Sequence, residues 1–218
     1  VRDAVRTALT SGVLPIVLGG DDSTAIPVLA AYDGHGPVSV VQVDAHLDFR
    51  EEMDGERFGY SSPMRRASEM AWVRRILHIG QRGVGSARRT DVADSQAAGN
   101  TIVTAEALHT QGAHGVAGLL EPAEPFVIVL DVDGIDPPEA PAVRAPVASG
   151  PSLRLVTELL VACIERGSLR GMVITELDPP LDVNGITARN VTRLICRVLD
   201  VAMVPTAPER GRVDKHDL

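Results

Sequence analysis

The chain has 218 residues and a net charge of −8, and 44% of its residues are hydrophobic but only 3% aromatic. This length allows one domain with an aliphatic core. The negative charge argues against a non-specific nucleic-acid or membrane surface, so we expect neither partner. No apolar run approaches the roughly 20 residues of a membrane span. The two cysteines, Cys163 and Cys196, are predicted to be reduced core residues of a cytoplasmic protein.

Predicted strands and helices alternate along the chain. We expect strands near residues 15–18, 38–44, 76–80, 102–104, 125–133 and 171–178. We expect helices at 1–11, 24–32, 61–74, 88–98, 104–120 (one or two), 153–167 and 187–203. This alternation predicts a parallel sheet covered by helices on both faces. No repeat or linker interrupts it, so we expect a single domain over residues 1–218, with a frayed polar tail at 208–218.

Two apolar runs end abruptly in acids: VVQVDAHLDF at 40–49 and VIVLDVDGIDP at 127–137. Residues two apart on a strand share a face. The pattern therefore predicts that Asp44, His46 and Asp48 point one way, and that Asp131 and Asp133 do the same. An acid that caps a helix would explain one Asp at a strand end, but not three polar groups on one face.

Such a cluster of carboxylates needs positive charge nearby. Buried acids without partners repel one another and lose hydration, and divalent cations remedy both effects. A mixture of carboxylate and imidazole ligands suits manganese, zinc or iron, whereas calcium and magnesium prefer oxygen alone. The sequence therefore predicts a metal site at the ends of two core strands.

The motifs GGDDS, DAHLD, SSPMRRASE, DVDGIDP and TELDPP follow one another along the chain. In this order they resemble the ureohydrolase family of arginases and agmatinases, and most of all the agmatinase-like guanidino-acid hydrolases. The resemblance implies a three-layer α/β/α fold of the arginase/deacetylase kind with a mostly parallel sheet. It also implies two Mn²⁺ ions, hydrolysis of a small cationic guanidino compound (agmatine or a guanidino acid) to urea and an amine, and a homo-oligomer, trimer or hexamer. Family members carry a long segment before the first motif, so we expect an N-terminal portion to be absent here.

The resemblance also implies a role for each acid. Asp44 and Asp131 would bridge the two metals; Asp22 and Asp48 would complete one metal's shell, and His46 and Asp133 the other's. Two divalent ions that share a water make it acidic enough to attack near neutral pH. Asp48 would orient this water and pass a proton to the leaving amine. Glu176 would accept hydrogen bonds from the guanidinium group of the substrate.

Three positions depart from the family pattern. Asp22 stands where a histidine ligand is usual, which makes the centre one charge more negative. We expect the shared water to be less acidic and a cationic substrate to bind more strongly as a result. Tyr60, a third candidate catalytic residue, stands near the position where the family often has a histidine proposed to shuttle protons, but a phenol holds its proton far above neutral pH. Arg144 stands where glycine is usual, and it could bind a substrate carboxylate in two-pronged fashion.

Several alternatives stay open from the sequence. Asp22 could cap a helix, Glu176 could be an ordinary acid at a strand end, and Arg144 could be a solvated loop residue. The function could be that of a related amidine or formimidoyl hydrolase. It could also be that of a catalytically degraded relative that serves as a binding or assembly subunit.

Overall fold

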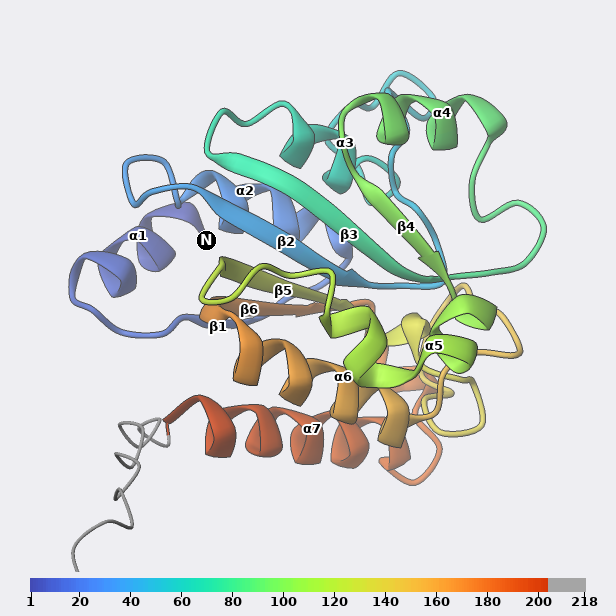
Figure 1. The fold of residues 1–218 in the computed structure, drawn as a ribbon. Helices are drawn as coiled ribbons and strands as arrows, with labels where there is room; N and C mark the ends of the chain where they lie inside the picture. Colours follow the sequence, from blue (N-terminus) through green and yellow to red (C-terminus); the bar gives the residue numbers. More distant parts are fainter. Residues whose placement is uncertain (204–218) are drawn as a thin grey trace, which may run out of the picture.

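A computed structural model describes residues 1–203 of the chain (Figure 1). The polar tail predicted at 208–218 lies outside the described residues. Within them, six strands form one sheet in the order β1-β6-β5-β2-β3-β4, and every neighbouring pair is parallel. The strands are β1 (Ile16–Leu18), β2 (Val38–Val43), β3 (Val73–Gln81), β4 (Thr101–Thr104), β5 (Pro125–Asp131) and β6 (Ser168–Thr175).

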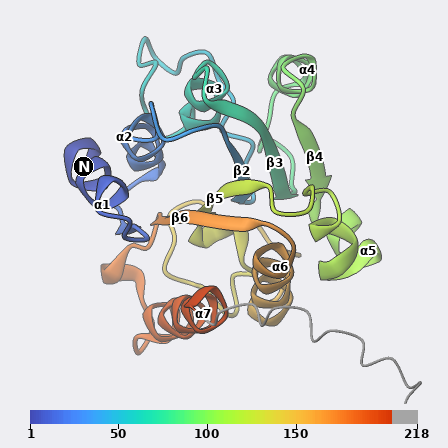
Figure 2. The ribbon, with the colours of Figure 1, turned by 60° about the vertical axis from the view of Figure 1, so that its left-hand side comes forward.

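Helices cover both faces of the sheet, so the predicted three-layer α/β/α fold is confirmed. The first face carries α1 (Arg2–Thr10), α2 (Ala25–Ala30), α3 (Pro63–Ser68) and α4 (Arg89–Ala97). The second carries α5 (Ala105–Ala117), α6 (Leu153–Arg166) and α7 (Ile186–Met203). Figure 2 shows the two groups of helices on opposite sides of the strands. No helix among residues 1–203 has the length and apolarity that a membrane crossing requires.

The alternation of side chains along the strands divides the core in two. Val38 and Val40 of β2 pack with the first group of helices, whereas Val41 and Val43 pack with the second. All six residues of β2 are buried, as expected for a central strand of a parallel sheet covered on both faces. Two of them, Ser39 and Gln42, are polar, and Gln42 faces the first group of helices together with the even-numbered valines.

Two predictions about the elements were wrong. The helix expected at 61–74 ends at Ser68, because Val73 pairs with Val38 and already begins β3. The indole of Trp72 donates to the Leu29 carbonyl at 2.9 Å, which fixes the turn between the two elements. Of the two cysteines predicted to be core residues, only Cys163 is buried, since Cys196 lies on the exposed side of α7; both are free thiols.

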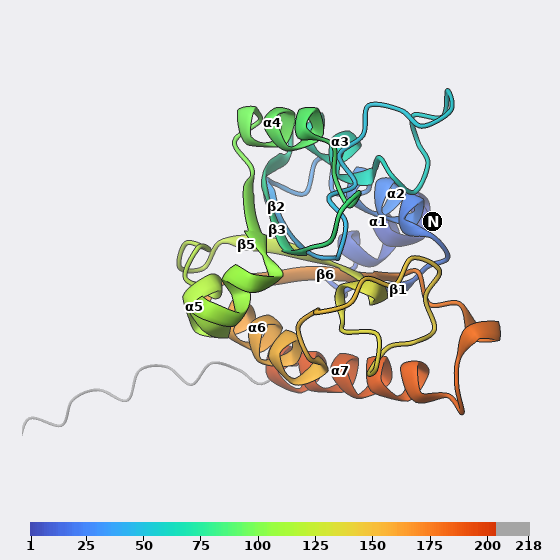
Figure 3. The same cartoon turned by 90° about the vertical axis from the view of Figure 1, so that its right-hand side faces the viewer.

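The carboxyl ends of the strands point to the right in Figure 1, and Figure 3 looks onto that side. The long connections that follow β2 and β5 lie there, at residues 44–62 and 135–152. The connection after β6 holds the short helix η3 (Pro179–Leu181), and η1 (Asp22–Thr24) follows β1. These loops surround the strand ends that carry the predicted acids.

Candidate metal centre

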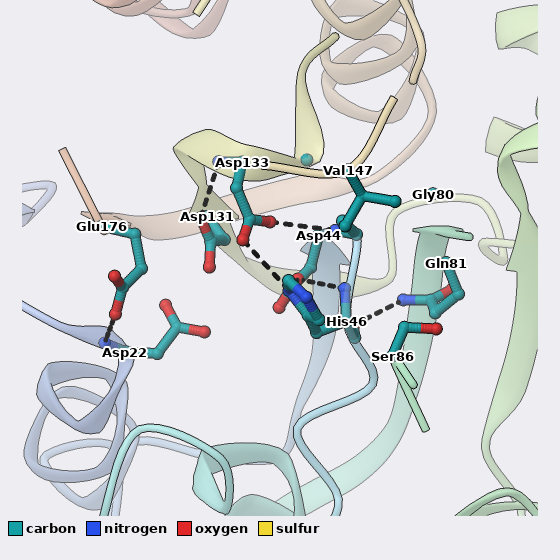
Figure 4. Close-up of polar contacts among 12 residues, drawn as sticks. Asp22, Asp44, His46, Gly80, Gln81, Ser86, Asp131, Asp133, Val147 and Glu176 are labelled. Atoms are coloured by element: carbon teal, nitrogen blue, oxygen red, sulfur yellow. Dashed lines mark hydrogen bonds and ion pairs between the residues drawn. The ribbon is translucent and has the colours of Figure 1, made fainter. Parts of the chain in front are cut away.

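Acidic side chains gather where four neighbouring strands end. Asp22 follows β1, Asp44 follows β2, Asp131 is the last residue of β5 and Glu176 follows β6. The four strands are adjacent in the sheet, so their carboxyl ends meet at one edge, which is where open parallel sheets bind ligands. In Figure 4 these side chains point toward one another from different elements.

The segment that carries Asp44, His46 and Asp48 is a turn, so the strand geometry assumed for it was wrong. β2 ends at Val43, and Asp48 has a positive φ of 49°. The turn is fixed by the His46 N–H, which donates to Asp44 Oδ1 at 2.5 Å, and by the Met64 N–H, which donates to the Asp48 carbonyl at 3.1 Å. Side chains predicted to share a strand face are thus brought together by a bend instead.

Two glycines let other segments pack directly against Asp44. A Cβ on Gly134 would lie 2.8 Å from the Asp44 nitrogen, and a Cβ on Gly80 would lie 3.0 Å from its carbonyl oxygen. Gly80 also has a φ of 104°, which other residues rarely adopt. The absence of side chains at these two positions brings the strand ends of β3 and β5 close enough for their polar groups to meet.

Asp44, His46 and Asp133 form one potential metal site, in which one ligand atom from each lies within 4.8 Å of the others. His46 Nδ1 lies 3.0 Å from Asp133 Oδ2 and 3.6 Å from Asp44 Oδ1. The other carboxylate oxygen of Asp133 accepts a hydrogen bond from the Ala45 N–H at 3.2 Å. This group holds three of the four ligands expected for that metal; Asp131, the second bridging ligand expected from the resemblance, is not among them.

Asp22, Asp44, Asp48 and Asp131 form a second such group within the same 4.8 Å limit. Asp22 Oδ1 accepts a hydrogen bond from the Thr175 hydroxyl, whereas its Oδ2 is buried and has no hydrogen-bond partner among the described residues. Asp131 Oδ1 accepts from the Asp133 N–H at 2.7 Å. Asp44 is common to both groups, as a ligand that bridges two cations would be. The unpartnered oxygen of Asp22 and the all-carboxylate donor set both fit a divalent cation.

Burial makes these carboxylates hard to ionise together. It raises the pKa of Asp44 to about 8, and the neighbouring Asp133 and Asp22 add to this rise. Burial, followed by the repulsion of Asp44 and Asp22, raises the pKa of Asp48 and of Asp131 well above the ordinary range. Within residues 1–203 no arginine forms an ion pair with any of the five acids of the two ligand groups, which are Asp22, Asp44, Asp48, Asp131 and Asp133. Among residues 1–203 His46 pairs with these acids and Arg82 attracts Asp133, Asp44 and Asp131 without an ion pair. These two positive charges do not balance five carboxylates, whereas divalent cations would.

His46 is the cation nearest to this cluster. Hydrogen bonds to Asp133 and Asp44 raise the pKa of its imidazole to about 10, against the opposing effect of burial. Without a metal the ring is therefore protonated and paired with Asp133. A metal must displace that proton to bind the ring nitrogen, so metal binding at this site releases a proton.

The whole architecture has known counterparts. A model of the arginase family matches residues 1–200. The chain belongs to the arginase family. The recognition of the ureohydrolase motifs in the sequence is thereby confirmed.

Three related proteins illustrate the likeness. The guanidinobutyrase of Pseudomonas aeruginosa is 33% identical over 88% of this chain and 62% of its own length. The mitochondrial guanidino acid hydrolase of Homo sapiens is 28% identical over 91% of this chain and 58% of its own length. The structure of proclavaminate amidino hydrolase from Streptomyces clavuligerus superimposes with a TM-score of 0.83 at 26% identity, over 92% of this chain and 68% of that one. The chain thus spans about three fifths of the length of the two curated relatives.

In this arginase-family protein the metal-centre acids open into a cavity of about 760 Å³, which His46, Asp48, Asp133 and Glu176 line. Glu176 lies just beyond β6 in a left-handed conformation, with a φ of 64°. Its Oε1 accepts the Asp22 N–H at 3.0 Å, and burial raises its pKa to about 7. The carboxyl group predicted to meet the guanidinium therefore borders the same cavity as the metal groups.

Tyr60 and Arg144 lie at the mouth of this cavity. Tyr60 is 51% exposed and comes from the loop after β2. Arg144 Nη2 lies 2.8 Å from Asp178 Oδ2, while 77% of the arginine side chain is exposed. The contact with Asp178 lacks hydrogen-bond geometry. The N–H groups of Arg144 therefore remain available to a ligand in the cavity.

Sequence reasoning missed two residues that support the centre. Thr175 donates to Asp22 from the last position of β6, and Gln42 Nε2 donates to Asp44 Oδ2 at 2.6 Å from within β2. Gln42 had a visible signal, since it is the one amide in the buried run VSVVQV. Asp178, for which no role was predicted, pairs with Arg144. His78 is a buried histidine with hydrogen-bond partners at both ring nitrogens.

Proposed function

We propose that this chain is the catalytic part of a hydrolase that uses two divalent cations, Mn²⁺ by analogy with the family, to split a guanidino acid into urea and an amine. The observation that supports it best is the pair of ligand groups that share Asp44 beside a cavity. Asp44 and Asp131 would bridge the cations, with Asp22 and Asp48 on one and His46 and Asp133 on the other. Manganese and a trimeric or hexameric assembly remain predictions from the family, and the cytoplasm remains a prediction from the two cysteines.

The cation pair, when bound, would supply an acidified water for attack on the guanidinium carbon. Glu176 would hold the guanidinium by accepting its N–H groups, which aligns the planar carbon for attack. The water oxygen would bond to that carbon, and the bond from carbon to the substituted nitrogen would break. Asp48 would carry one proton from the water to the departing nitrogen, and the proton left on the attacking oxygen would follow it to the amine, so that urea and a protonated amine leave.

The position of Arg144 favours a substrate that carries a carboxylate at the end opposite its guanidinium group. Its exposed guanidinium lies at the cavity mouth, where it would bind a carboxylate in exchange for Asp178. Agmatine carries a second cation there instead and would meet the arginine's repulsion. Tyr60, on the same rim, would contact the substrate or the departing amine but is not required as a proton shuttle in this scheme.

Urea release is the decisive measurement. Protein loaded with Mn²⁺ is assayed on 4-guanidinobutyrate, other guanidino acids, agmatine and a formimidoyl amino acid, with the Asp44→Asn variant as the control. We expect urea from guanidino acids, with higher kcat/KM than agmatine, and roughly a 1,000-fold loss in the variant, as expected when several kcal/mol of metal catalysis disappear.

Other outcomes select the alternatives. Turnover of the formimidoyl compound alone would point to an amidine hydrolase with the same centre. Two bound Mn²⁺ ions per chain without turnover of any compound would point to a relative that has lost catalysis. The replacement Arg144→Ala separates the substrate classes, because it should raise KM for guanidino acids and leave that for agmatine unchanged or lower.

A further inference from the structure

A line of buried polar side chains runs from Asp44 into the interior, on the sheet face that α4 covers. Gln42 on β2 and His78 on β3 are direct partners in the parallel register. Gln42 Nε2 donates to Asp44 Oδ2 at 2.6 Å, and Gln42 Oε1 lies 2.5 Å from His78 Nδ1. His78 Nε2 lies 2.9 Å from the Ser95 hydroxyl of α4, to which Asn100 Nδ2 donates at 3.3 Å. We call Gln42, His78, Ser95 and Asn100 the inner chain.

Chemistry fixes the direction of every hydrogen bond in the inner chain. As a metal ligand Asp44 is ionised and accepts only, so the amide group of Gln42 that faces it must be the NH₂, as it is in the structure. The Gln42 carbonyl then faces His78, whose Nδ1 must carry the hydrogen. A neutral imidazole has no hydrogen on its other nitrogen, so Nε2 accepts the Ser95 O–H.

The far end of the inner chain is fixed as well. Asn100 Oδ1 accepts the backbone N–H of Ile76 at 2.9 Å, so its NH₂ must face Ser95. The hydrogen bonds therefore all point from Asn100 toward Asp44. Full burial holds His78 neutral, as the arrangement requires, because it lowers the pKa of the ring to about 3.

Asp44 is held from two sides by this geometry. One carboxylate oxygen accepts from Gln42 and the other from the His46 N–H. Each oxygen has two lone pairs, so one on each remains for a cation. Asp44 is the residue that both potential metal groups share, and the orientation of its carboxylate therefore affects both.

We propose that His78 and Gln42 are positioning residues, which fix the Asp44 carboxylate through the inner chain so that each of its oxygens faces one cation. The proposal rests on the two-cation centre of the proposed function. A role in folding alone would not need these groups, because a pair of apolar side chains of similar size is often as stable in a buried position. The ordered polar chain ends on a shared ligand, which is where outer hydrogen bonds tune metal affinity.

The test measures Mn²⁺ binding, from the signal of free Mn²⁺ in electron paramagnetic resonance, together with melting temperature. Gln42→Leu and His78→Leu should each weaken Mn²⁺ binding roughly 10- to 100-fold, the usual cost of losing an outer hydrogen bond at a metal site. The double variant should bind like Gln42→Leu alone, because His78 acts only through Gln42. Ser39→Ala is the matched control: it removes a buried hydrogen bond to Glu124 at the other end of β2, and should lower the melting temperature without changing Mn²⁺ affinity.

A conservative variant guards against misfolding. In His78→Asn the amide NH₂ can replace Nδ1–H toward Gln42, so we expect Mn²⁺ affinity to recover to within a few-fold of the unchanged protein. The ring itself gives an independent measurement: in protein loaded with a diamagnetic divalent cation such as Zn²⁺, nitrogen NMR shifts should show His78 as the neutral Nδ1–H tautomer. A charged ring, the Nε2–H tautomer, or Leu variants with unchanged affinity would overturn the proposal. If the unchanged protein bound no Mn²⁺, the two-cation centre itself would be wrong, and the positioning role with it.

Discussion

The same sheet buries acids at both ends, and the two ends treat them differently. At the amino end, Glu124 precedes β5 and is 4% exposed. Both nitrogens of the Arg75 guanidinium that face it donate, at 2.7 and 3.2 Å, and the Ser39 hydroxyl and the Glu121 N–H at 2.7 Å complete its shell. Burial alone would raise the pKa of Glu124, but these hydrogen bonds outweigh it and the pKa is lowered.

At the carboxyl end, five acids share the imidazole of His46, and no arginine within residues 1–203 forms an ion pair with them. Their pKa values are raised where a shift is resolved, and one oxygen of Asp22 has no partner among residues 1–203. The contrast shows that this chain can neutralise a buried acid with its own side chains. Its failure to do so at the carboxyl end is therefore a local property of that site, and it is the best evidence for an external cation there.

Of the changes that test this contrast, addition of Mn²⁺ should alter the melting temperature most. Two sites, each at a Mn²⁺ concentration of about 100 times Kd, would stabilise the metal-free protein by about 5 kcal/mol. For a chain of this size that raises the melting temperature by about 10–20 °C. Differential scanning calorimetry with and without Mn²⁺, after treatment with a chelator, measures it, and the Asp44→Asn variant should show little of the rise. A melting temperature that Mn²⁺ leaves unchanged would contradict the two-cation centre.

Removal of the Arg75 partner of Glu124, at the amino end of the sheet, should lower stability and leave metal binding unchanged. In Arg75→Met the buried carboxylate of Glu124 loses its cation, which costs about 3 kcal/mol, at the low end for a buried pair because Arg75 is partly exposed. The melting temperature should fall by about 6–12 °C, while the dissociation constant for Mn²⁺ stays unchanged. A weaker Mn²⁺ affinity in this variant would mean that the two ends of the sheet are coupled.

The two ends should also respond oppositely to pH. The pKa of Asp44 is raised to about 8, so the folded metal-free protein keeps a proton that the unfolded chain loses near pH 4. Its contribution is complete below pH 4 and declines as pH rises toward 8. The lowered pKa of Glu124 gives the reverse, a contribution lost only in acid. We expect the metal-free protein to melt several degrees lower at pH 8 than at pH 5, and Mn²⁺ to remove that difference.

A melting temperature of the metal-free protein that rose between pH 5 and pH 8 would contradict the raised pKa values. The Asp44→Asn variant is the control, since it cannot take up that proton and should show a smaller slope.

The sequence predicted the carboxyl end better than the amino end, for a physical reason. Asp44, Asp131 and their neighbours stand in short motifs. These motifs hold several acids, whereas helix capping after a buried strand needs only one, and the excess indicates a binding site. The partners of Glu124 come from Ser39 and Arg75, which are far away in sequence and carry no local pattern. The fold followed from the alternation of strands and helices, whereas the turn at 44–48 did not, because a positive φ at Asp48 leaves no trace in residue spacing.

Asp22 is the acid of the proposed centre that differs most from Glu124, because one of its buried oxygens lacks a hydrogen-bond partner among residues 1–203. The variant Asp22→His should therefore have the smallest but most specific effect. It removes one negative charge beside the proposed shared water, which makes that water more acidic. We expect the acidic limb of the kcat/KM profile to move down by about one to two pH units, the effect of one charge several ångströms away at an effective dielectric constant near 20. Asp21→Asn is the control, since this exposed acid bonds Ser23 and belongs to neither ligand group; it should move the limb far less. Equal shifts in both variants would mean that Asp22 acts only through its distant charge, and an unmoved profile in Asp22→His would place it outside the centre.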